Sequence, residues 1–398
     1  MAEVLCAVLA TLACLSLLAA AIAAMSAGSA LSEGPADPTA FGELPKVSVL
    51  KPLKGLDDGL YENLASFARQ DHPDYEILFG AEDPEDPALD VALRVKRDFP
   101  SVPVSVLVCS GGSGRNPKVR NLAILAARAR HETLLISDSN VRVDPGYLRA
   151  TAAELRDPRV GLVTNLIAGV GGKDESLGSL LENLHLNTFV IGATTMARAL
   201  AGRACVVGKS MLFRKRDLER LGGWKSLRNL LAEDYLLGRK FEKAGFKVAL
   251  SSHVVRTVNE SWPVSRFLSR HVRWGQLRRR VSPGAFLAEL LLNPVLLIVL
   301  ALAARGSSLR AGEAALGAGG VLFKCALDAR LVGRLRNQPL PLFDIAWIPV
   351  KDLLIAAVWP LAAFKRTVCW RGNEMRIGRA TRLFPARTPH LDVAGETP

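Results

Sequence analysis

An acidic residue and an amide follow a short apolar run in a spacing suited to metal and phosphate binding. The run at 134–136 is followed by Asp138 and Asn140, with Ser139 between them. A run this short predicts a buried strand, and open α/β sheets bind ligands just past the carboxyl ends of such strands. Oxygen atoms placed there can hold a hard divalent cation, which in turn holds a diphosphate. A solvated turn is the alternative interpretation, because Asp, Ser and Asn all favour turns.

Two further acidic clusters stand at the ends of predicted elements. The strand predicted at 75–80 runs directly into Glu82 and Asp83, and Glu233 and Asp234 open a predicted helix that ends at Ala244. Carboxylates in these positions either serve a ligand or cap a helix. A site that gathers all three clusters would place several carboxylates around one anionic, ion-bound substrate.

Basic and aromatic side chains form a third motif, Arg270-x-x-Arg273-Trp274. On a helix these residues fall at i, i+3 and i+4, so both guanidinium groups and the indole share one face. Guanidinium groups match phosphate oxygens in a bidentate way. A basic helix face on lipid headgroups, with Trp274 as an interfacial anchor, is the alternative.

Three further polar residues are weaker candidates. Lys118 follows the glycine-rich, basic segment 111–117 at the start of a predicted helix, where it could serve an anionic ligand. That segment has neither the order of a P-loop nor that of a dinucleotide fingerprint. Lys209 and Ser210 lie in a predicted strand at 206–215, and a structural role for all three is an equal alternative.

The elements that must position these residues alternate along the chain. Strands are predicted at 47–50, 75–80, 102–108 and 134–136, and helices at 60–69, 87–99 and 119–129. A helix at 147–155 and a strand at 160–166 continue the pattern. The alternation predicts an α/β fold with a doubly wound nucleotide-binding sheet. The apolar stretch 177–201 is predicted to be either a lid helix or a helix lying on the membrane.

Apolar segments at both ends of the chain predict a membrane protein. The 398 residues are 49% hydrophobic, and residues 4–25 contain no charge, which is long enough to cross a hydrocarbon core of ~30 Å. The only charged side chain before this run is Glu3, so the basic start of a signal peptide is missing and an uncleaved anchor is favoured. The predicted units are a 1–25 anchor, a 26–44 linker, a 45–282 catalytic domain, 283–365 membrane helices and a 366–398 basic tail.

The C-terminal apolar segments differ in their charge. Residues 285–304 form a strong candidate span and 316–331 a weaker one, while 342–364 contains Asp344, Lys351 and Asp352 and is expected to be re-entrant or interfacial. Basic residues in the tail favour the cytosol. We therefore expect an outside N-terminus and a cytosolic catalytic domain on a bacterial inner membrane.

Net charge and cysteine content limit the ligands and the kinds of structural site that the protein could have. The formal net charge of +13 would suggest nucleic acid in a soluble protein, but beside membrane segments it favours anionic headgroups and an anionic substrate, so no nucleic acid is expected. The six cysteines have no C-x-x-C spacing, so neither a zinc site nor a disulfide framework is predicted.

The ordered set of motifs resembles the glycosyltransferases of the family 2 type and, more closely, the ceramide glucosyltransferases of the family 21 type. The motifs are Glu82-Asp83-Pro84, Asn116-Pro117-Lys118, Asp138-Ser139-Asn140, Cys205-Val206-Val207-Gly208-Lys209-Ser210, Ala232-Glu233-Asp234-Tyr235, Arg270-x-x-Arg273-Trp274 and Trp370-Arg371-Gly372. The match spans residues 45–375. One departure is Asn140, where the family 2 pattern has a second aspartate.

The resemblance implies a GT-A-type domain that transfers a sugar, glucose first, from a UDP-sugar to a lipid hydroxyl with inversion. It implies Asp234 as the base, with Arg270, Arg273 and Trp274 completing the catalytic group. Asp83, Lys118 and Glu233 would bind the nucleotide sugar, and Asp138 and Asn140 would hold Mg²⁺ or Mn²⁺. Lys209 and Ser210 are candidates for the acceptor side.

Ceramide is the acceptor that the resemblance implies, and several alternatives remain open. The acceptor could be a hopanoid or another polyisoprenoid lipid, or the enzyme could be a polysaccharide synthase, for which the apolar segments look too few to build a channel. A non-catalytic membrane scaffold with a degenerate transferase domain is the alternative outside the enzymes, and Asn140 is the only residue that suggests it.

Overall fold

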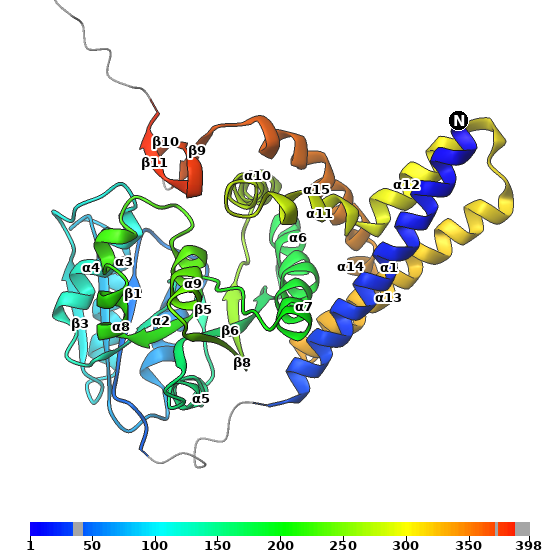
Figure 1. The fold of residues 1–398 in the computed structure, drawn as a ribbon. Coiled ribbons are helices and arrows are strands. Elements are labelled where there is room, and N and C mark those ends of the chain that lie inside the picture. Colours follow the sequence, from blue (N-terminus) through cyan, green and yellow to red (C-terminus); the bar gives the residue numbers. More distant parts are fainter. Residues whose placement is uncertain (35–42, 371–372, 387–398) are drawn as a thin grey trace, which may run out of the picture.

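The computed structural model describes residues 1–34, 43–370 and 373–386 and comprises an α/β domain, a helical arm and a small C-terminal sheet (Figure 1). In this described part of the chain, eight strands form one mixed sheet in the order β3-β2-β1-β4-β7-β6-β8-β5. The arm projects from the side of the domain formed by α6 and α7 (Figure 1).

The first half of the sheet is parallel and matches the sequence prediction. Its strands are β1 (Val47–Pro52), β2 (Tyr75–Ala81), β3 (Val104–Val108) and β4 (Thr133–Ile136). β1 pairs with β2 on one side and β4 on the other, so Val49 lies between Ile77 and Leu135. The carboxyl ends of β1, β2 and β4 therefore meet at one edge, immediately before the polar residues of interest.

The second half of the sheet departs from a purely parallel arrangement. It contains β5 (Val141–Arg142), β6 (Val160–Val170), β7 (Met211–Arg214) and β8 (Lys247–Val258). β7 runs antiparallel to both β4 and β6, whereas β6 and β8 are parallel. The predicted strand at 206–215 is thus shorter than expected, because residues 206–210 form a loop that leads into the sheet from the cleft side.

Helices cover both faces of the sheet, as a doubly wound fold requires. The helices are α2 (Leu60–Ala68), α3 (Ala88–Asp98), α4 (Pro117–Arg128), α5 (Tyr147–Glu154), α8 (Lys215–Arg220) and α9 (Glu233–Lys243). Phe67 and Tyr147 belong to a core that contains α2, α3 and α5, while Leu122 and Phe241 belong to a second core with α4, α8 and α9. These two cores hold the cleft edge of the sheet rigid.

The stretch predicted as a lid or membrane-lying helix is a packed element of the domain. It comprises α6 (Leu177–His185), a π-helix η1 (Leu186–Val190) and α7 (Ile191–Ala201). The Asn187 side chain donates to the carbonyl of Gly169 at 2.8 Å and accepts from its N–H at 2.7 Å, which fixes η1 against β6. Further along the chain, α10 (Val264–Val281) packs on α6 and carries the predicted basic motif.

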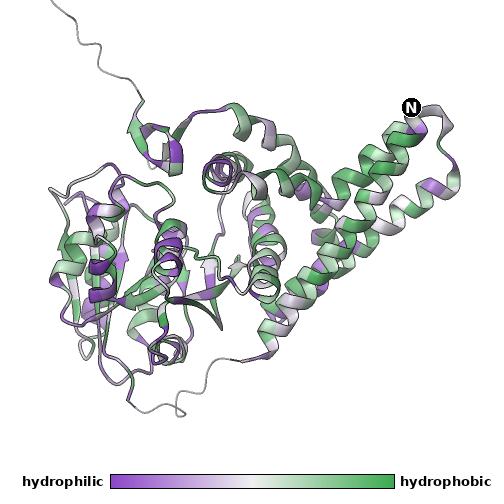
Figure 2. Cartoon of the chain, viewed as in Figure 1, coloured by the Kyte–Doolittle hydropathy of each residue, from purple (hydrophilic) through white to green (hydrophobic). Residues whose placement is uncertain are grey.

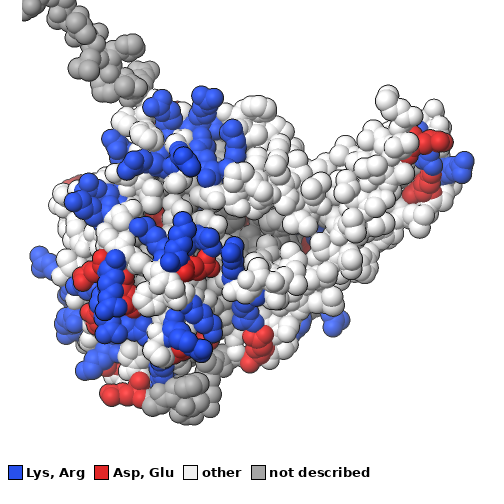
Figure 3. Space-filling view, viewed as in Figure 1, with Lys and Arg blue, Asp and Glu red and all other residues white. Residues whose placement is uncertain are grey.

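The helical arm consists of α1 (Ala2–Ser32), α12 (Pro294–Arg305) and α13 (Ala311–Arg336) lying side by side (Figure 1). Figure 2 shows that α1 and α12 are hydrophobic along most of their length, and Figure 3 shows almost no charged side chains on this face of the arm between its base and its tip. α1 extends to Ser32, beyond the predicted boundary at residue 25, and Gly28 lets Arg334 of α13 approach closely.

The C-terminal apolar segments differ from the sequence expectation in two ways. The span predicted at 285–304 is broken into α11 (Pro283–Leu291) and α12, which are bent by 57°, because Asn293 caps α12 and Pro294 occupies its first turn. Of the described helices, two are long and apolar enough to cross a membrane, 3–32 and 342–364, and the bent α11–α12 pair adds a third if it forms one broken span. The segment 342–364 comprises α14 (Leu342–Ile345) and α15 (Trp347–Phe364), and α15 packs on α10.

The predicted basic tail is partly folded. Its described residues form a second sheet of β9 (Thr367–Trp370), β10 (Asn373–Ile377) and β11 (Leu383–Pro385). This sheet returns to the α/β domain, where Leu383 N–H donates to the carbonyl of Asn229 at 2.8 Å. Arg371 and Gly372 of the quoted tail motif lie outside the described residues.

Candidate active site

Two adjoining cavities lie at the carboxyl edge of the sheet and together form what we call the cleft. The smaller, of about 190 Å³, is lined by Asp83 and Asp86, and the larger, of about 450 Å³, by Asp234 and the basic face of α10. Lys118 and Asp138 line both. The cleft is therefore long enough to hold an extended ligand whose middle section lies over Lys118 and Asp138.

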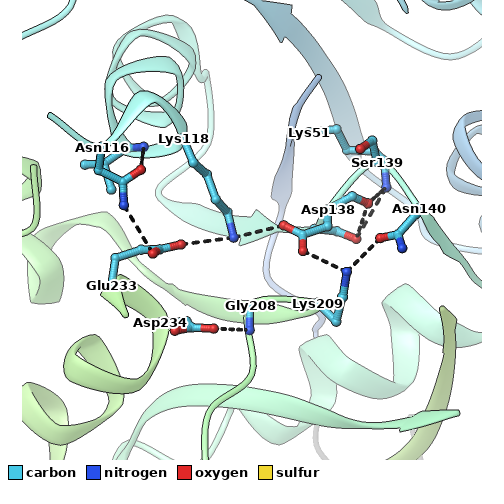
Figure 4. A network of polar contacts seen from close by, with 12 residues as sticks. Lys51, Asn116, Lys118, Asp138, Ser139, Asn140, Gly208, Lys209, Glu233 and Asp234 are labelled. Carbon is cyan, nitrogen blue, oxygen red and sulfur yellow. Dashed lines mark hydrogen bonds and ion pairs between the residues drawn. The ribbon is translucent and has the colours of Figure 1, made fainter. Parts of the chain in front are cut away.

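Asp138 sits at the centre of the cleft between two ammonium groups (Figure 4). Its Oδ1 lies 2.9 Å from Lys118 Nζ, its Oδ2 lies 3.0 Å from Lys209 Nζ, and Lys209 also donates to Asn140 Oδ1 at 2.7 Å. Burial would raise the pKa of Asp138, but the two lysines outweigh it and hold that pKa well below its usual range. The centre of the cleft thus contains an ionised carboxylate and two cations.

Lys118 also joins Asp138 to the acidic pair of α9. Its Nζ lies 3.1 Å from Glu233 Oε1, and the Asn116 amide donates to the other carboxylate oxygen at 3.2 Å (Figure 4). Burial raises the pKa of Glu233 to about 7, although Lys118 opposes the shift. Asn116 caps α4 as well, because its side chain accepts from Val119 N–H. The short segment 116–118 therefore starts α4 and also places the ammonium group of Lys118 in the cleft.

Asp234 lies in the first turn of α9 with its carboxylate held by backbone groups. It accepts from Gly208 N–H at 2.8 Å and from Tyr235 N–H at 2.7 Å. A Cβ at position 208 would lie 2.8 Å from Lys118 Nζ and 3.0 Å from Asp234 Oδ2, so only glycine permits this approach. The carboxylate is oriented, partly exposed and lines the larger cavity, which suits it to accept a proton.

The basic motif of α10 faces the larger cavity as its spacing predicts. Arg270, Arg273 and Trp274 all line it, together with Trp262. The Arg270 guanidinium lies between two indole rings, 5.2 Å from the centroid of Trp262 and 4.5 Å from that of Trp274. Its side chain is only 12% exposed, so it is held in one place in the cavity that Asp138 and Asp234 also line.

Glu182 of α6 anchors Arg270 and was not identified from the sequence. It is fully buried, and its two carboxylate oxygens lie 3.1 Å from Arg270 Nε and 3.0 Å from His271 Nε2. Arg270 and the hydrogen bond from His271 offset the effect of burial, so the pKa of Glu182 is lowered overall. The only sequence signal was a lone acidic residue in the apolar stretch 177–201.

A buried lysine beneath the cleft was also missed. Lys51 is fully buried at the end of β1, where it donates to the carbonyl of Asp138 at 2.9 Å and lies 3.6 Å from the Phe67 ring centroid (Figure 4). Burial lowers its pKa well below the usual value. It supports the backbone that presents Asp138. The sequence analysis ended the predicted strand at residue 50, before Lys51, and gave no signal of this role.

Of the other predicted site residues, Asp83 and Lys209 lie in the cleft and Ser210 does not. Asp83 lines the smaller cavity, and Lys209 reaches Asp138 at the centre of the cleft. Ser210 does not line the cleft, since it is buried and its hydroxyl contacts Tyr147 Oη and Asn165 Oδ1, each at 2.6 Å. Its carbonyl also accepts from Thr164 Oγ1 at 2.9 Å, so the residue is held in the core just before β7 begins.

The donor set at Asp138 and Asn140 is chemically suited to a divalent metal ion, but it is poor in ligands. No cluster of three His, Cys, Asp or Glu side chains able to hold a metal occurs within the described residues. Mg²⁺ commonly takes one or two carboxylates and completes its shell with substrate phosphates and water. Because Lys118 and Lys209 hold both Asp138 oxygens, an ion at Asp138 would have to displace at least one ammonium group.

The C-terminal sheet holds the loop that precedes the acidic pair. Thr381 accepts from Leu231 N–H through its carbonyl at 3.1 Å and from Ala232 N–H through its hydroxyl at 3.2 Å. Thr381 is fully buried and has a φ of 58°, a strained conformation for a β-branched residue. The backbone that ends at Glu233 is therefore fixed by a segment about 150 residues further along the chain.

Comparison with protein families identifies one match over nearly the whole chain. The model for "Glycosyl transferase family 21" matches residues 8–383. Among curated proteins, ceramide glucosyltransferase 3 of Caenorhabditis elegans is 27% identical over 369 residues, covering 86% of this chain and 75% of that protein. Ceramide glucosyltransferase 1 of the same organism is 26% identical and covers 87% and 74%.

Solved structures support the fold independently of the sequence. The mannosyltransferase PcManGT from Pyrobaculum calidifontis, in complex with GDP-Man and Mn²⁺, aligns with a TM-score of 0.58 at 18% identity. The alignment covers 90% of this chain and 99% of that one. The likeness confirms the predicted GT-A-type fold.

Proposed function

The chain belongs to glycosyl transferase family 21, and we propose that it transfers glucose from UDP-glucose to the primary hydroxyl of ceramide with inversion at the anomeric carbon. It is a membrane-bound glycosyltransferase that acts on a lipid acceptor. The identity of the sugar and acceptor rests on the relatives reported above, which are named ceramide glucosyltransferases. No feature of the cleft favours a hopanoid, a polysaccharide or a non-catalytic scaffold over this reaction.

One observation carries the proposal: an oriented carboxylate and an anchored guanidinium group line one cavity, which adjoins a second, acid-lined one. Asp234 and Arg270 line the larger cavity, Asp83 lines the smaller, and Asp138 lies at the junction. This order matches the order of parts in a nucleoside diphosphate sugar. We assign the uridine to the Asp83 side, the diphosphate to the junction and the sugar to the larger cavity.

In the proposed reaction, Asp234 accepts the proton of the lipid hydroxyl as its oxygen attacks the anomeric carbon. The bond between that carbon and the diphosphate oxygen breaks, and UDP leaves with the bonding electrons. Lys118, Arg270 and Arg273 can stabilise the negative charge that develops on the diphosphate, because all three line the cleft. Trp274 offers a flat apolar face to the sugar ring.

A divalent ion is part of the proposal. Mn²⁺ occurs with GDP-Man in the structurally similar mannosyltransferase, and Asp138 and Asn140 are the residues that would hold such an ion here. When bound, the ion would neutralise diphosphate charge and act as a Lewis acid. Asn140 contributes a neutral oxygen, so Asp138 and the nucleotide would supply most of its ligands.

We further propose that the catalytic domain faces the cytosol of a bacterial cell and that the arm crosses the inner membrane. The apolar surface of α1 and the basic side chains gathered over the α/β domain and C-terminal sheet support this orientation (Figures 2 and 3). In this arrangement α1 crosses the membrane with the bent α11–α12 pair and α13 packed along it, and α15, although long and apolar enough to cross, lies at the base of the arm against α10.

The test is a transfer assay on the purified full-length protein in lipid nanodiscs. UDP-glucose and ceramide should yield glucosylceramide by mass spectrometry, and proton NMR of the product should show the β-anomer. UDP-galactose and GDP-mannose serve as alternative donors, and diacylglycerol and a hopanoid alcohol as alternative acceptors. Preference for another donor or acceptor, or an α-linked product, would contradict the corresponding part of the proposal.

Asp234→Asn separates chemistry from binding. It should leave UDP binding nearly unchanged and lower turnover roughly 10²- to 10⁴-fold, which is the usual contribution of a positioned base. Asp217→Asn, which removes a buried carboxylate in α8 away from the cleft, is the matched control. Turnover of Asp234→Asn within a few-fold of the parent would remove Asp234 from the role of base.

A further inference from the structure

The helix that carries Glu233 and Asp234 has no side-chain cap at its start. Ala232 occupies the N-cap position of α9, where Ser, Thr, Asp or Asn usually accepts a hydrogen bond from the first turn. The methyl group of an alanine cannot accept one. The position of the first turn, which holds both carboxylates, therefore depends on contacts made by the residues that precede the helix.

Thr381 makes those contacts from the C-terminal sheet. It lies in the η4 turn (Arg379–Thr381) between β10 and β11 and is fully buried. Its carbonyl accepts from Leu231 N–H at 3.1 Å, and its hydroxyl accepts from Ala232 N–H at 3.2 Å. One residue from a distant part of the chain thus holds both N–H groups that lead into Glu233.

The backbone of Thr381 adopts a conformation that a β-branched residue disfavours. Its φ is 58°, and the φ of the preceding Ala380 is 49°; Asn337 is the other non-glycine residue with a positive φ in the described part of the chain. Strain of this kind persists where the surrounding structure enforces it, and it clusters at functional sites. Glycine would adopt this φ without strain, but it would lack the hydroxyl that Ala232 contacts.

Gln276 fastens the C-terminal sheet to α10 at its other end. The side chain of Gln276 is buried, and its Nε2 donates to the carbonyls of Lys365 and Thr367, each at 2.9 Å. Gln276 follows Arg273 by three residues and does not line the cleft. The sheet therefore contacts both elements that bring charged groups to the larger cavity.

One apolar core joins two walls of the larger cavity through this sheet. Leu231, before α9, and Leu277, on α10, both line the cavity, and both pack against the same core of the sheet. The sheet residues of this core are Val368, Met375, Ile377 and Leu383. The separation of the two walls, and with it the placement of Asp234 relative to the arginines of α10, depends on how this sheet is seated.

We propose that the C-terminal sheet is a positioning element of the active site, with Thr381 as the residue that orients the Asp234 end of the loop and Gln276 as the residue that ties the sheet to α10. None of the described residues of the sheet lines the cleft, so its effect is exerted through other residues. The inference rests on the proposed role of Asp234 as the base. It assigns the sheet to the chemical step and not to the binding of the nucleotide.

The test compares three substitutions of Thr381 in the full-length protein in nanodiscs. Thr381→Val keeps the shape and removes the hydroxyl. A misplacement of ~1 Å can slow a reaction about 100-fold, so we expect kcat to fall roughly 10- to 100-fold with the KM for UDP-glucose nearly unchanged. Thr381→Ser restores the hydrogen bond and should have a kcat within about threefold of the parent. Thr381→Gly relieves the strain but lacks the hydroxyl, so it should fold and still be slow.

Two controls separate positioning from a general loss of stability. Thr367→Val makes the same change on β9 of the same sheet, away from the contacts of Thr381, and should leave kcat unchanged. Hydrogen–deuterium exchange should rise in the peptide that contains Leu231 and Ala232 for Thr381→Val and not for Thr367→Val, because only the former frees the N–H of Ala232.

A double variant shows whether Thr381 acts through the base. If it does, adding Thr381→Val to Asp234→Asn should lower kcat no further, whereas independent effects would multiply. Gln276→Leu releases the other end of the sheet and should also lower kcat at a nearly unchanged KM.

The turnover comparison uses the donor and acceptor that give product in the transfer assay, so transfer to a lipid other than ceramide would contradict the proposed function and leave this test intact. The positioning role is overturned if folded Thr381→Val and Thr381→Gly both keep kcat within about threefold of the parent, or if the double variant is about tenfold slower than Asp234→Asn. It is also overturned if Thr381→Ser is as slow as Thr381→Val, or if exchange at residues 231 and 232 does not rise in Thr381→Val.

Discussion

The buried pair of Glu182 and Arg270 allows a direct test of whether the α10 motif acts in catalysis. Glu182→Gln preserves the shape of the side chain and can still accept one hydrogen bond, but it removes the charge that Arg270 Nε faces at 3.1 Å. If Arg270 stabilises the departing diphosphate, loosening its anchor should lower kcat and leave the KM for UDP-glucose nearly unchanged, because the effect belongs to the transition state.

The size of the effect follows from the environment of the pair. The contact is an ion pair, and two unit charges this close attract one another by ~5 kcal/mol at an effective dielectric constant of ~20. Glutamine keeps a dipole in the same place, so we expect ~1.5–3 kcal/mol of this to be lost, and since each ~1.36 kcal/mol is a tenfold change in rate, kcat would fall roughly 10- to 160-fold. Trp262 and Trp274 still enclose the guanidinium at 5.2 and 4.5 Å. This packing preserves part of its position, so we expect a decrease of roughly 10- to 50-fold.

The assay compares kcat, KM and thermal unfolding for Glu182→Gln with those for Glu175→Gln. Glu175 is a partly buried carboxylate that is also paired with an arginine, Arg336 at 3.3 Å, but it does not line the cleft. Both variants should lose stability, and only Glu182→Gln should lose turnover. A folded Glu182→Gln enzyme with kcat within threefold of the parent would refute the role of Glu182 in positioning Arg270.

Three further predictions address the metal, the basic helix and the acidic pair. Asn140→Asp adds a second carboxylate and should lower the divalent-ion concentration needed for half-maximal activity; an unchanged requirement in a metal titration would mean that residue 140 does not contact the ion. Arg273→Lys loses the guanidinium fork and should reduce turnover sharply without releasing the protein from membranes. Arg279→Lys, at an exposed position, should change neither turnover nor membrane binding. Equal, small effects of the two substitutions on turnover would mean that the motif is a headgroup-binding face and not part of the active site. The pKa of Glu233 is raised from 4.5 to about 7, so the folded protein binds the proton more tightly than the unfolded chain and loses stability, on the order of 3 kcal/mol at most, as pH rises through this range. Denaturant unfolding of Glu233→Gln should lack this loss, and parallel pH profiles of variant and parent would contradict the shift.

Local sequence patterns predicted the framework of the domain and the residues at its edge. Short apolar runs ending in acids predicted the strands that deliver Asp83 and Asp138, because burial and turn preference act over a few residues. The i, i+3, i+4 spacing predicted that Arg270, Arg273 and Trp274 share a helix face, which the structure confirms. The long uncharged run at the N-terminus predicted α1, since crossing a hydrocarbon layer depends on length and composition alone.

The exact start of a strand and the bend within a helical segment could not be predicted in the same way. The sequence suggested one strand over 206–215, whereas the chain enters the sheet only at Met211, so Lys209 faces the cleft and Ser210 the core. Likewise, the apolar content of 285–304 predicted one span, but the cap by Asn293 and the proline that follows bend it by 57°.

The sequence by itself determined the α/β framework, the apolar segments and the identity of most charged groups in the cleft, because each depends on neighbours within one or two turns. Tertiary structure alone decided which of those charges meet. Glu182 contacts Arg270 across 88 positions of the chain, and Thr381 fixes the backbone before Glu233 from 149 positions away, counting from Ala232. Such pairs form only when distant elements of the chain pack together. The entropy lost in bringing them together is offset by the packing of the whole fold, so no local pattern predicts these pairs.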